Sequence, residues 1–229
     1  MNSKNSQDFT TDTKTALLDA AERLFANEGI AESSVRAITA QAGTNLASVN
    51  YHFGSKEGLV RAVFARRIGP LNRQRLDSLE SCFSDSDGAI DLRCLLLAFV
   101  EPAVTMMMSQ DAGVREFVKL LGRVLSEPSG ELRSTVFEEF REVGERFTRE
   151  IARLLPGTPQ EEIVWRFHFM IGSMAHTVAA QQSLSHQLEC LHLQDEADAR
   201  TITDRLVSFF LSGWDGVRTM AKEREDAAR

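Results

Sequence analysis

The spacing of apolar side chains constrains this chain more than any other feature of its sequence. Along almost all of the 229 residues, apolar positions recur every three or four residues. Such steps place side chains on one face of an α-helix, whereas a β-strand needs strict alternation. Sustained alternation is missing and β-branched runs are few. The sequence therefore predicts an all-α fold.

The cysteine pattern bears on the environment of the chain. Cys82, Cys94 and Cys190 are widely separated and odd in number. This argues against a disulfide framework and against a CxxC-type metal or redox site, and it fits a reducing compartment. Residues 1–14 are polar and lack the apolar core of a secretory signal, so we expect a cytoplasmic protein.

One segment needs to be weighed as a membrane span. Residues 167–188 contain no Asp, Glu, Lys or Arg, but they include three histidines, three glutamines and several serines or threonines. This polarity favours a buried interface helix over a membrane span. We therefore expect no membrane partner.

Charge is unevenly distributed along the chain. The overall net charge of −7 argues at first sight against nucleic-acid binding. Residues 1–67, however, carry a net charge of +1, and the remainder carries −8. A near-neutral head joined to an acidic body indicates two separate tasks.

Capping residues divide the head into short helices. The first helix follows Asp12 or Thr13 and stops at Gly29, and the third runs from Asn45 to Phe53-Gly54. Between them, Ser33 or Ser34 starts a short second helix that ends at Gly43. Ser55 caps a fourth, long helix, which Gly69-Pro70 is expected to kink or break because proline removes a backbone donor.

The second and third helices form a predicted helix–turn–helix. They are consecutive and joined by a tight turn in which Gly43 takes a left-handed conformation. Leu46 and Val49 are expected to face inward, with Val49 packed on Ile38. The positions left facing outward are small or hydrogen-bonding, as a surface that reads a DNA groove should be: Ala47, Ser48, Asn50, Tyr51 and His52.

The rest of the chain is predicted to be helical. Helices are expected near residues 89–108 (bent at Pro102), 111–126, 128–155, 159–186 and 196–221, after a loop at 84–88. The predicted division is a disordered tail at 1–12, a helix–turn–helix domain at 13–57, a second helical domain at 58–221, and a frayed tail at 222–229.

The stretch Thr15–Leu59 resembles the DNA-binding head of the TetR family of transcriptional regulators. The signs of this resemblance are Leu24-Phe25 before Gly29, Ser33-Ser34, Ala42-Gly43, Tyr51-His52-Phe53 and the run from Ser55 to Leu59. Two departures are Thr39, where a small alanine is usual, and Asn50, where an aromatic is commoner. Asn50 is suited to a bidentate contact with adenine.

The resemblance implies roles for individual head residues. Arg36, Ser48 and Asn50 are candidates for base edges, and Ser34, Thr44, Asn45, Tyr51, His52 and Lys56 for phosphate or sugar contacts. Structural alternatives remain for four of them. Tyr51 would be a half-buried core aromatic, and His52 would cap the helix or pack beneath Phe53. Arg36 would pair with Glu32, and Ser48 would only admit close packing.

Two apolar stripes predict a homodimer, because one helix–turn–helix reads only a few base pairs. The stripes lie on the last two helices, which would form a four-helix bundle with a second copy. The alternative is burial within one protomer. The predicted interface residues are Phe167, Met170, Met174, Val178, Leu206, Phe210, Gly213, Trp214 and Val217.

The middle helices are rich in methionine and phenylalanine, which adapt to varied ligands. In the family this region encloses a small-molecule pocket, and residues 165–172 further resemble members that respond to fatty acids or their acyl thioesters. Arg123, Arg166 or His168 would meet an acidic end. The predicted effector site comprises Phe99, Met106, Met107, Phe117, Leu121, Phe137, Phe140, Arg166 and His168, with a plain core as the alternative.

Together these features predict a ligand-responsive homodimeric repressor that binds a pseudo-palindromic operator and is released by an apolar or acyl effector. No cofactor or metal is expected, although His186, Glu189, Cys190 and His192 lie close enough in sequence to be weighed as zinc ligands. The alternatives are a helical, perhaps metal-dependent enzyme, for which no catalytic motif is found, and an activator or non-specific DNA binder.

Overall fold

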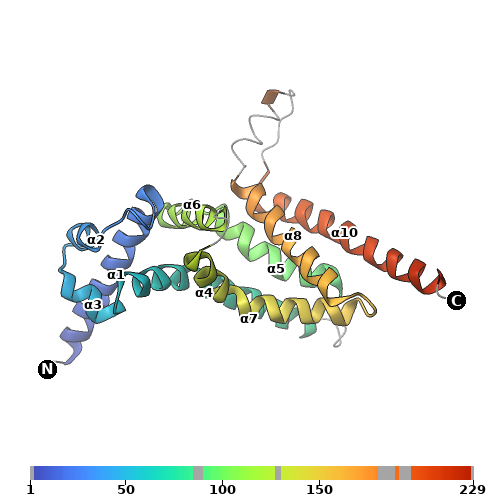
Figure 1. The fold of residues 1–229 in the computed structure, drawn as a ribbon, viewed down its shortest axis with the longest axis horizontal. Helices are drawn as coiled ribbons and strands as arrows, with labels where there is room; N and C mark the ends of the chain where they lie inside the picture. Colours follow the sequence, from blue (N-terminus) through green and yellow to red (C-terminus); the bar gives the residue numbers. More distant parts are fainter. Residues whose placement is uncertain (1–2, 85–89, 127–129, 180–188, 191–196, 228–229) are drawn as a thin grey trace. The chain divides into compact units, whose positions relative to one another are not determined.

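The computed structural model describes residues 3–84, 90–126, 130–179, 189–190 and 197–227, and none of these lies in a β-strand (Figure 1). The all-α prediction is therefore confirmed for the described chain. Its helices are α1 (Ser3–Glu28), α2 (Val35–Gln41), α3 (Leu46–Phe53), α4 (Lys56–Ser84), α5 (Leu92–Met107), α6 (Ala112–Ser126), α7 (Glu131–Leu154), α8 (Gln160–Ala179) and α10 (Ala199–Ala227).

The chain divides into two compact units. The head unit comprises residues 1–70 and 109–139, and the body unit comprises residues 71–108 and 140–229. The division falls inside α4, at Pro70, and inside α7, at Glu139. A large part of the helical body, including all of α6, thus belongs with the predicted DNA-binding head.

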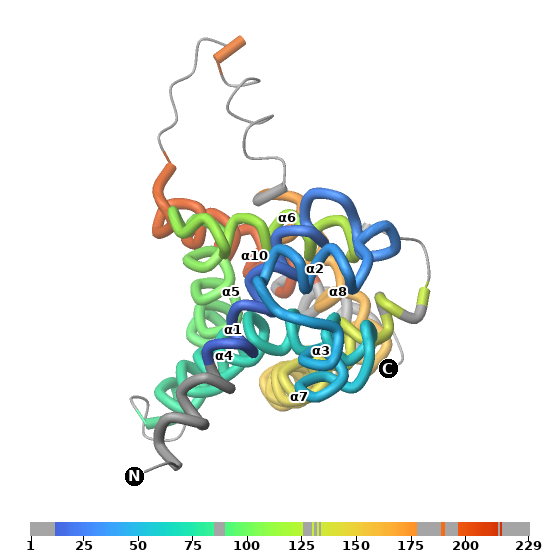
Figure 2. The backbone as a smooth tube through the Cα atoms, turned by 90° about the vertical axis from the view of Figure 1, so that its left-hand side faces the viewer, coloured from blue at the N-terminus to red at the C-terminus, as the bar shows by residue number. Residues whose placement is uncertain are grey.

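Helix α1 is the centre of the head unit. It packs against α2, α3 and α6, as the tube of Figure 2 shows for the blue and cyan segments. Leu17, Phe25, Ile38 and Val49 are buried on these faces. Phe64 of α4 meets Phe117 of α6 edge to face, with ring centroids 5.8 Å apart. Burial of this apolar surface is the main stabilising contribution to such a bundle.

A buried carboxylate ties α1 to α4 within the head unit. Glu22 is only 1% exposed, and its carboxylate accepts hydrogen bonds from Arg66 and from Arg67, whose Nη2 lies 2.8 Å from Oε1. Arg66 also donates to Asp19 at 2.6 Å. Burial by itself lowers the pKa of Arg66, but the hydrogen bonds from Glu22 and Asp19 prevail and raise it.

Helix α6 approaches this charged cluster closely at Gly113. A Cβ atom added there would lie 2.6 Å from Nη2 of Arg67 and 3.6 Å from Oε1 of Glu22. Further along α6, Arg123 donates to the backbone carbonyl of Ala26 at 3.1 Å. These two contacts fix α6 against both α1 and the charged cluster.

The body unit has an aromatic core. The Phe99 ring of α5 contacts Phe147 of α7 and Phe167 of α8, with centroid separations of 5.1 and 4.8 Å. Helices α5, α8 and α10 pack on one another. Trp214 of α10 is buried, and its indole Nε1 lies 3.4 Å from the sulfur of Met170.

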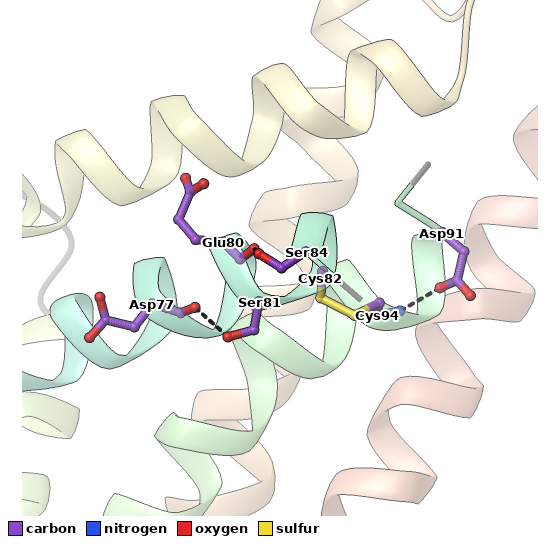
Figure 3. The surroundings of a disulfide bond; sticks show 7 residues. All are labelled: Asp77, Glu80, Ser81, Cys82, Ser84, Asp91 and Cys94. Carbon is purple, nitrogen blue, oxygen red and sulfur yellow. Dashed lines mark hydrogen bonds between the residues drawn. A yellow bond between two sulfur atoms is a disulfide. The ribbon is translucent and has the colours of Figure 1, made fainter. Parts of the chain in front are cut away.

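A disulfide corrects our expectation for the cysteines. Cys82 of α4 and Cys94 of α5 are bonded, with their Cα atoms 6.0 Å apart (Figure 3), whereas the exposed Cys190 takes no part in a disulfide. Asp91 caps α5 beside the bond, since its carboxylate accepts from the Cys94 backbone N–H at 2.6 Å. Sequence spacing did not indicate this pair, because the two cysteines lie on different helices and only the packing of α4 against α5 brings them together.

Several helix ends differ from those expected. Helix α4 is continuous through Gly69-Pro70, so the predicted break is wrong, although Pro70 does mark the boundary between the units. Helix α5 likewise contains Pro102. Helix α1 begins at Ser3, before the expected cap at Asp12, and α10 extends to Ala227.

Candidate nucleic-acid interface

The local sequence of the head builds α2 and α3 as predicted. The Ser34 side chain accepts from the Ala37 backbone N–H at 3.1 Å and caps α2. Asn45 caps α3 in the same way, accepting from Ser48 N–H at 3.1 Å. Gly43, in the turn between them, has φ +64°, and this left-handed conformation favours glycine.

The outward face of α3 is open to solvent. Val49 and Ile38 are buried where α3 packs on α2. On the opposite side, Ala47, Asn50 and Tyr51 are exposed, and Tyr51 has 77% of its surface accessible. The alternative of a half-buried core tyrosine is therefore wrong. Leu46 is 48% exposed, which corrects its expected inward orientation, because it lies in the first turn, beyond the packed face.

Some candidate residues are held by local hydrogen bonds. Thr44 donates to the Ser48 hydroxyl at 2.8 Å, and the Ser48 hydroxyl lies 3.3 Å from the Asn45 Oδ1 acceptor. This network orders the first turn of α3. Lys56 donates from Nζ to the carbonyl of Ala31 at 3.1 Å. Ser48 and Lys56 therefore help to hold the shape of the motif.

Other candidates present their side chains more freely. Arg36 is exposed and, within the described chain, forms no ion pair with Glu32, so that structural alternative is not supported. His52 is half-buried and contacts the Tyr51 ring edge to face at 4.9 Å and the Phe53 ring at 6.0 Å.

Ser55 caps α4 by accepting from Gly58 N–H at 3.1 Å. The pKa of Glu57 is lowered by a hydrogen bond from its own backbone and a second from Ser55.

The residues predicted for the effector site belong to both units. Phe117, Leu121 and Phe137 are in the head unit, where Phe117 is fully buried against Phe64. The others belong to the body unit: Phe99, Met106, Met107, Phe140, Arg166 and His168.

The two polar members of that set do not face an apolar core. Arg166 pairs with Glu162 at 2.6 Å and donates to the Gly213 carbonyl. His168 is exposed beside Trp165. Arg123, the third candidate for an acidic ligand group, is an exposed residue that donates to Ala26. Sequence reasoning missed Arg75, which is 2% exposed in the body unit; its polar neighbours, Asn72 to Gln74, gave no signal of burial.

The predicted dimer stripes are core residues of one protomer. The two stripes are buried between α5, α8 and α10, as the alternative reading held: Phe167, Met170, Met174, Leu206, Phe210 and Trp214. The spacing of three to four residues correctly predicted buried stripes. The helices that cover them belong to the same chain and not, as expected, to a second copy. Gly213 is exposed, and the side chains of Val178 and Val217 lie outside the described part of the chain.

The opposite faces of these helices carry large exposed apolar side chains. We call this set the exposed aromatic face: Val164, Trp165 and Phe169 of α8 and Phe209 of α10. Phe209 also lines a shallow depression on α10 with Thr201, Asp204 and Ser208. The rings of Trp165 and Phe169 lie together, with centroids 5.8 Å apart, and adjoining exposed apolar side chains of this kind mark interaction sites.

The metal and membrane alternatives gain no support from the described residues. No group of three or more potential metal-ligating side chains occurs among them, and His186 and His192 lie outside them. No single described helix is both long and apolar enough to cross a bilayer.

Comparison with known proteins agrees with this architecture. Residues 17–63 match the family described as bacterial regulatory proteins, tetR family, and residues 97–213, more than half of the chain, match the tetracyclin repressor-like C-terminal domain. A nicotine-responsive transcriptional repressor, HdnoR of Paenarthrobacter nicotinovorans, is 26% identical over 147 residues, which cover 64% of this chain and 69% of HdnoR.

Solved structures share the fold at lower identity. FadR of Bacillus subtilis in complex with stearoyl-CoA has a TM-score of 0.62 at 17% identity, covering 87% of this chain and 98% of FadR. SmeT, a repressor of a multidrug efflux pump of Stenotrophomonas maltophilia, has a TM-score of 0.58 at 18% identity, covering 88% of this chain and 91% of SmeT. These relatives are transcriptional regulators, not enzymes. The chain belongs to the TetR family and is a DNA-binding transcriptional regulator.

Proposed function

We propose that this protein is a homodimeric, ligand-responsive repressor that acts in the cytoplasm on a pseudo-palindromic operator. The observation that carries the proposal is the outer face of α3, where Ala47, Asn50 and Tyr51 are exposed while Val49 on the opposite face is buried. A short helix braced in this way fits the major groove of duplex DNA.

The head residues divide by their geometry into two roles. Arg36 and Asn50 are exposed and read base edges, with Asn50 suited to adenine and Arg36 to guanine. Tyr51 and His52, with Ser34, Thr44 and Asn45 at the helix starts, contact phosphates and sugars and so set the register. Ser48 and Lys56 take part in the same interface while holding the motif through their contacts with Asn45 and Ala31.

A second copy of the chain covers the exposed aromatic face. Trp165 and Phe169 of α8 and Phe209 of α10 are each more than half exposed, and Gly172 and Gly213 beside them admit close helix approach. A two-fold interface uses the same surface on both protomers, so these side chains of each protomer are buried against those of the other. The resulting pair of heads matches the symmetry of a pseudo-palindrome.

The effector acts through the body unit. Names of similar proteins point to nicotine in one case and to stearoyl-CoA in another; we favour an apolar or acyl ligand because the body core is rich in Phe and Met side chains. Helix α4 belongs to both units, so a ligand that favours one position of residues 71–84 changes the separation of the heads.

The experiment that tests this function selects duplexes from a random DNA pool with the full chain and measures affinity for the winner. We expect Asn50→Ala to weaken the selected site about tenfold or more, whereas Glu28→Ala, on the exposed end of α1, leaves affinity unchanged. Equal binding to the selected site and to scrambled competitor at fixed salt would show a non-specific binder.

The dimer is tested separately by sedimentation. Trp165→Ser combined with Phe209→Ser should convert the dimer to monomer and abolish tight operator binding. A reporter assay in cells then distinguishes repression from activation, because a repressor lowers transcription from the selected operator.

A further inference from the structure

A buried arginine lies in the middle of the body unit. Arg75 of α4 is 2% exposed, and its Nε donates to the backbone carbonyl of Phe99 at 2.9 Å. The guanidinium carbon lies 4.0 Å from the centre of the Phe99 ring and 6.0 Å from that of Phe140. One backbone carbonyl and two aromatic rings are therefore its neighbours.

Arg75 differs in its charge environment from the other arginines shielded from solvent. The half-buried arginines of the described chain each contact a Glu or Asp carboxylate: Arg66, Arg67, Arg146 and Arg166. The more deeply buried Arg75 has no carboxylate partner among the described residues. Burial alone lowers the pKa of Arg75 to about 9, so the side chain still carries its charge at neutral pH.

The chemistry of the guanidinium defines what fits it. The hydrogen bond to the Phe99 carbonyl uses only Nε, and the planar fork of the two terminal nitrogens suits a carboxylate in bidentate geometry. The rings of Phe99 and Phe140 lie against the Arg75 guanidinium, and Phe99 in turn contacts Phe147 and Phe167. A ligand for this place has an apolar body and one anionic group.

We propose that Arg75 is the anion-binding residue of the effector site and receives the carboxylate of an apolar acid. This inference rests on the proposed ligand-responsive function and narrows its ligand class. A buried, uncompensated cation is costly to the free protein, and an anionic ligand removes that cost because it brings the missing charge. Organic cations are excluded from the same place by repulsion.

The position of Arg75 also gives the ligand a route to act on the head. Arg75 lies on α4 five residues after Pro70, where the helix passes from the head unit into the body unit. A carboxylate that binds Arg75 competes with the Phe99 ring and carbonyl for the guanidinium. Ligand binding therefore changes the contact between α4 and α5 within the body unit.

The experiment measures binding of palmitate and of hexadecanol, its neutral counterpart, to the full-length protein by calorimetry. We expect Arg75→Met to weaken palmitate about ten- to a hundredfold, the loss of a charge-assisted hydrogen-bond pair, and to change hexadecanol less than twofold. Arg75→Lys retains part of the palmitate affinity. Arg73→Met, an exposed arginine on the same helix, is the matched control and binds as the parent does.

Three results with palmitate and hexadecanol would overturn the assignment. They are equal losses for palmitate and hexadecanol in Arg75→Met, no loss for either, and no binding of palmitate by the parent protein. Binding of palmitoyl-CoA is measured separately in the parent and in Arg75→Met. If it binds tightly and with the same affinity to both, the anion contact lies elsewhere and the proposal is contradicted. Operator binding by the ligand-free protein is measured in parallel, so failure of the DNA-binding function is seen independently.

A fold control accompanies these measurements. Thermal unfolding of ligand-free Arg75→Met should occur at the same temperature as the parent or higher, because the variant removes an uncompensated charge. A marked drop in the unfolding temperature would show that Arg75 is a structural residue, against the proposal.

Discussion

Each unit buries a charged residue where α4 contacts another helix, and only the one in the head unit is compensated. In the head unit the buried charge is Glu22, and two arginines from α4 contact its carboxylate. In the body unit Glu150 is also buried and is paired with Arg146 and Arg153, whereas Arg75 of α4 is buried with rings and one carbonyl as its described contacts. Glu22 and Arg75 are both at most 2% exposed. The comparison shows that ion pairs of Arg66 and Arg67 with Glu22 hold α4 to α1. Where α4 contacts α5, by contrast, the Arg75 cation has no described carboxylate partner.

The largest expected effect comes from breaking the compensated cluster. Glu22→Ala leaves Arg66 and Arg67 partly buried without their shared carboxylate, and we expect the free energy of unfolding to fall by about 3–5 kcal/mol. Urea denaturation of the two proteins measures the difference. Glu28→Ala, at the exposed end of the same helix, should change stability by less than about 0.5 kcal/mol. Equal effects of both variants would mean that the cluster contributes nothing special.

The next largest effect is expected from the Cys82–Cys94 disulfide, which holds α4 to α5 covalently where Arg75 provides no charge pair. The bond closes a loop with a sequence separation of 12, and its removal in Cys82→Ala/Cys94→Ala should lower the free energy of unfolding by about 3 kcal/mol. Adding a thiol reductant to the parent should reproduce that loss. The same reductant should leave the double variant unchanged, and any further loss there would assign the effect to another group.

The third effect has the opposite sign. Arg75→Met should leave the free energy of unfolding unchanged or raise it by up to about 2 kcal/mol, since methionine fills similar space without a buried charge. Equilibrium urea unfolding at pH 7 measures it. Because the folded pKa of about 9 lies below the ordinary value for arginine, the parent should itself gain stability from this group as the pH rises above 9, and Arg75→Met should lose that component.

The smallest effects compare one helix cap from each unit. Ser34→Ala removes the cap of α2 in the head, and Asp91→Ala removes the cap of α5 in the body; each should lower stability by about 1 kcal/mol. Hydrogen exchange locates the loss. Faster exchange confined to the unit that carries the substitution indicates independent opening, whereas faster exchange in both shows one cooperative block.

Local features of the head were predictable from the sequence, because their causes lie within a few residues. The caps Ser34, Asn45 and Ser55 and the turn at Gly43 each depend on neighbours three or four positions away. The outward placement of Asn50 and Tyr51 followed from the same local geometry. Periodicity thus predicted the motif and the face it presents.

Long-range features were not predictable in the same way. The spacing of Phe167, Met170 and Met174 revealed a buried stripe, but not that α5 and α10 of the same chain cover it. The packing of α4 on α5 brings Cys82 and Cys94 close enough to form their disulfide. The same packing buries Arg75 against Phe99, although the residues next to Arg75 in sequence are polar. Each depends on which helices meet, and the period of one helix carries no such information.

Pro70 lies within a single helix shared by two bodies, and this has a consequence for torsion. A proline cannot donate to the carbonyl four residues earlier, which belongs to Arg66, so the turn that follows the Glu22 cluster lacks one rung of its ladder. The weakened turn lies between residues 71–84 and the contacts of Arg66 and Arg67 with Glu22 of α1. Rotation of residues 71–84 about the helix axis therefore deforms this turn first and those contacts only afterwards. The stiffness of one turn thus sets how much twist is transmitted and how much is absorbed.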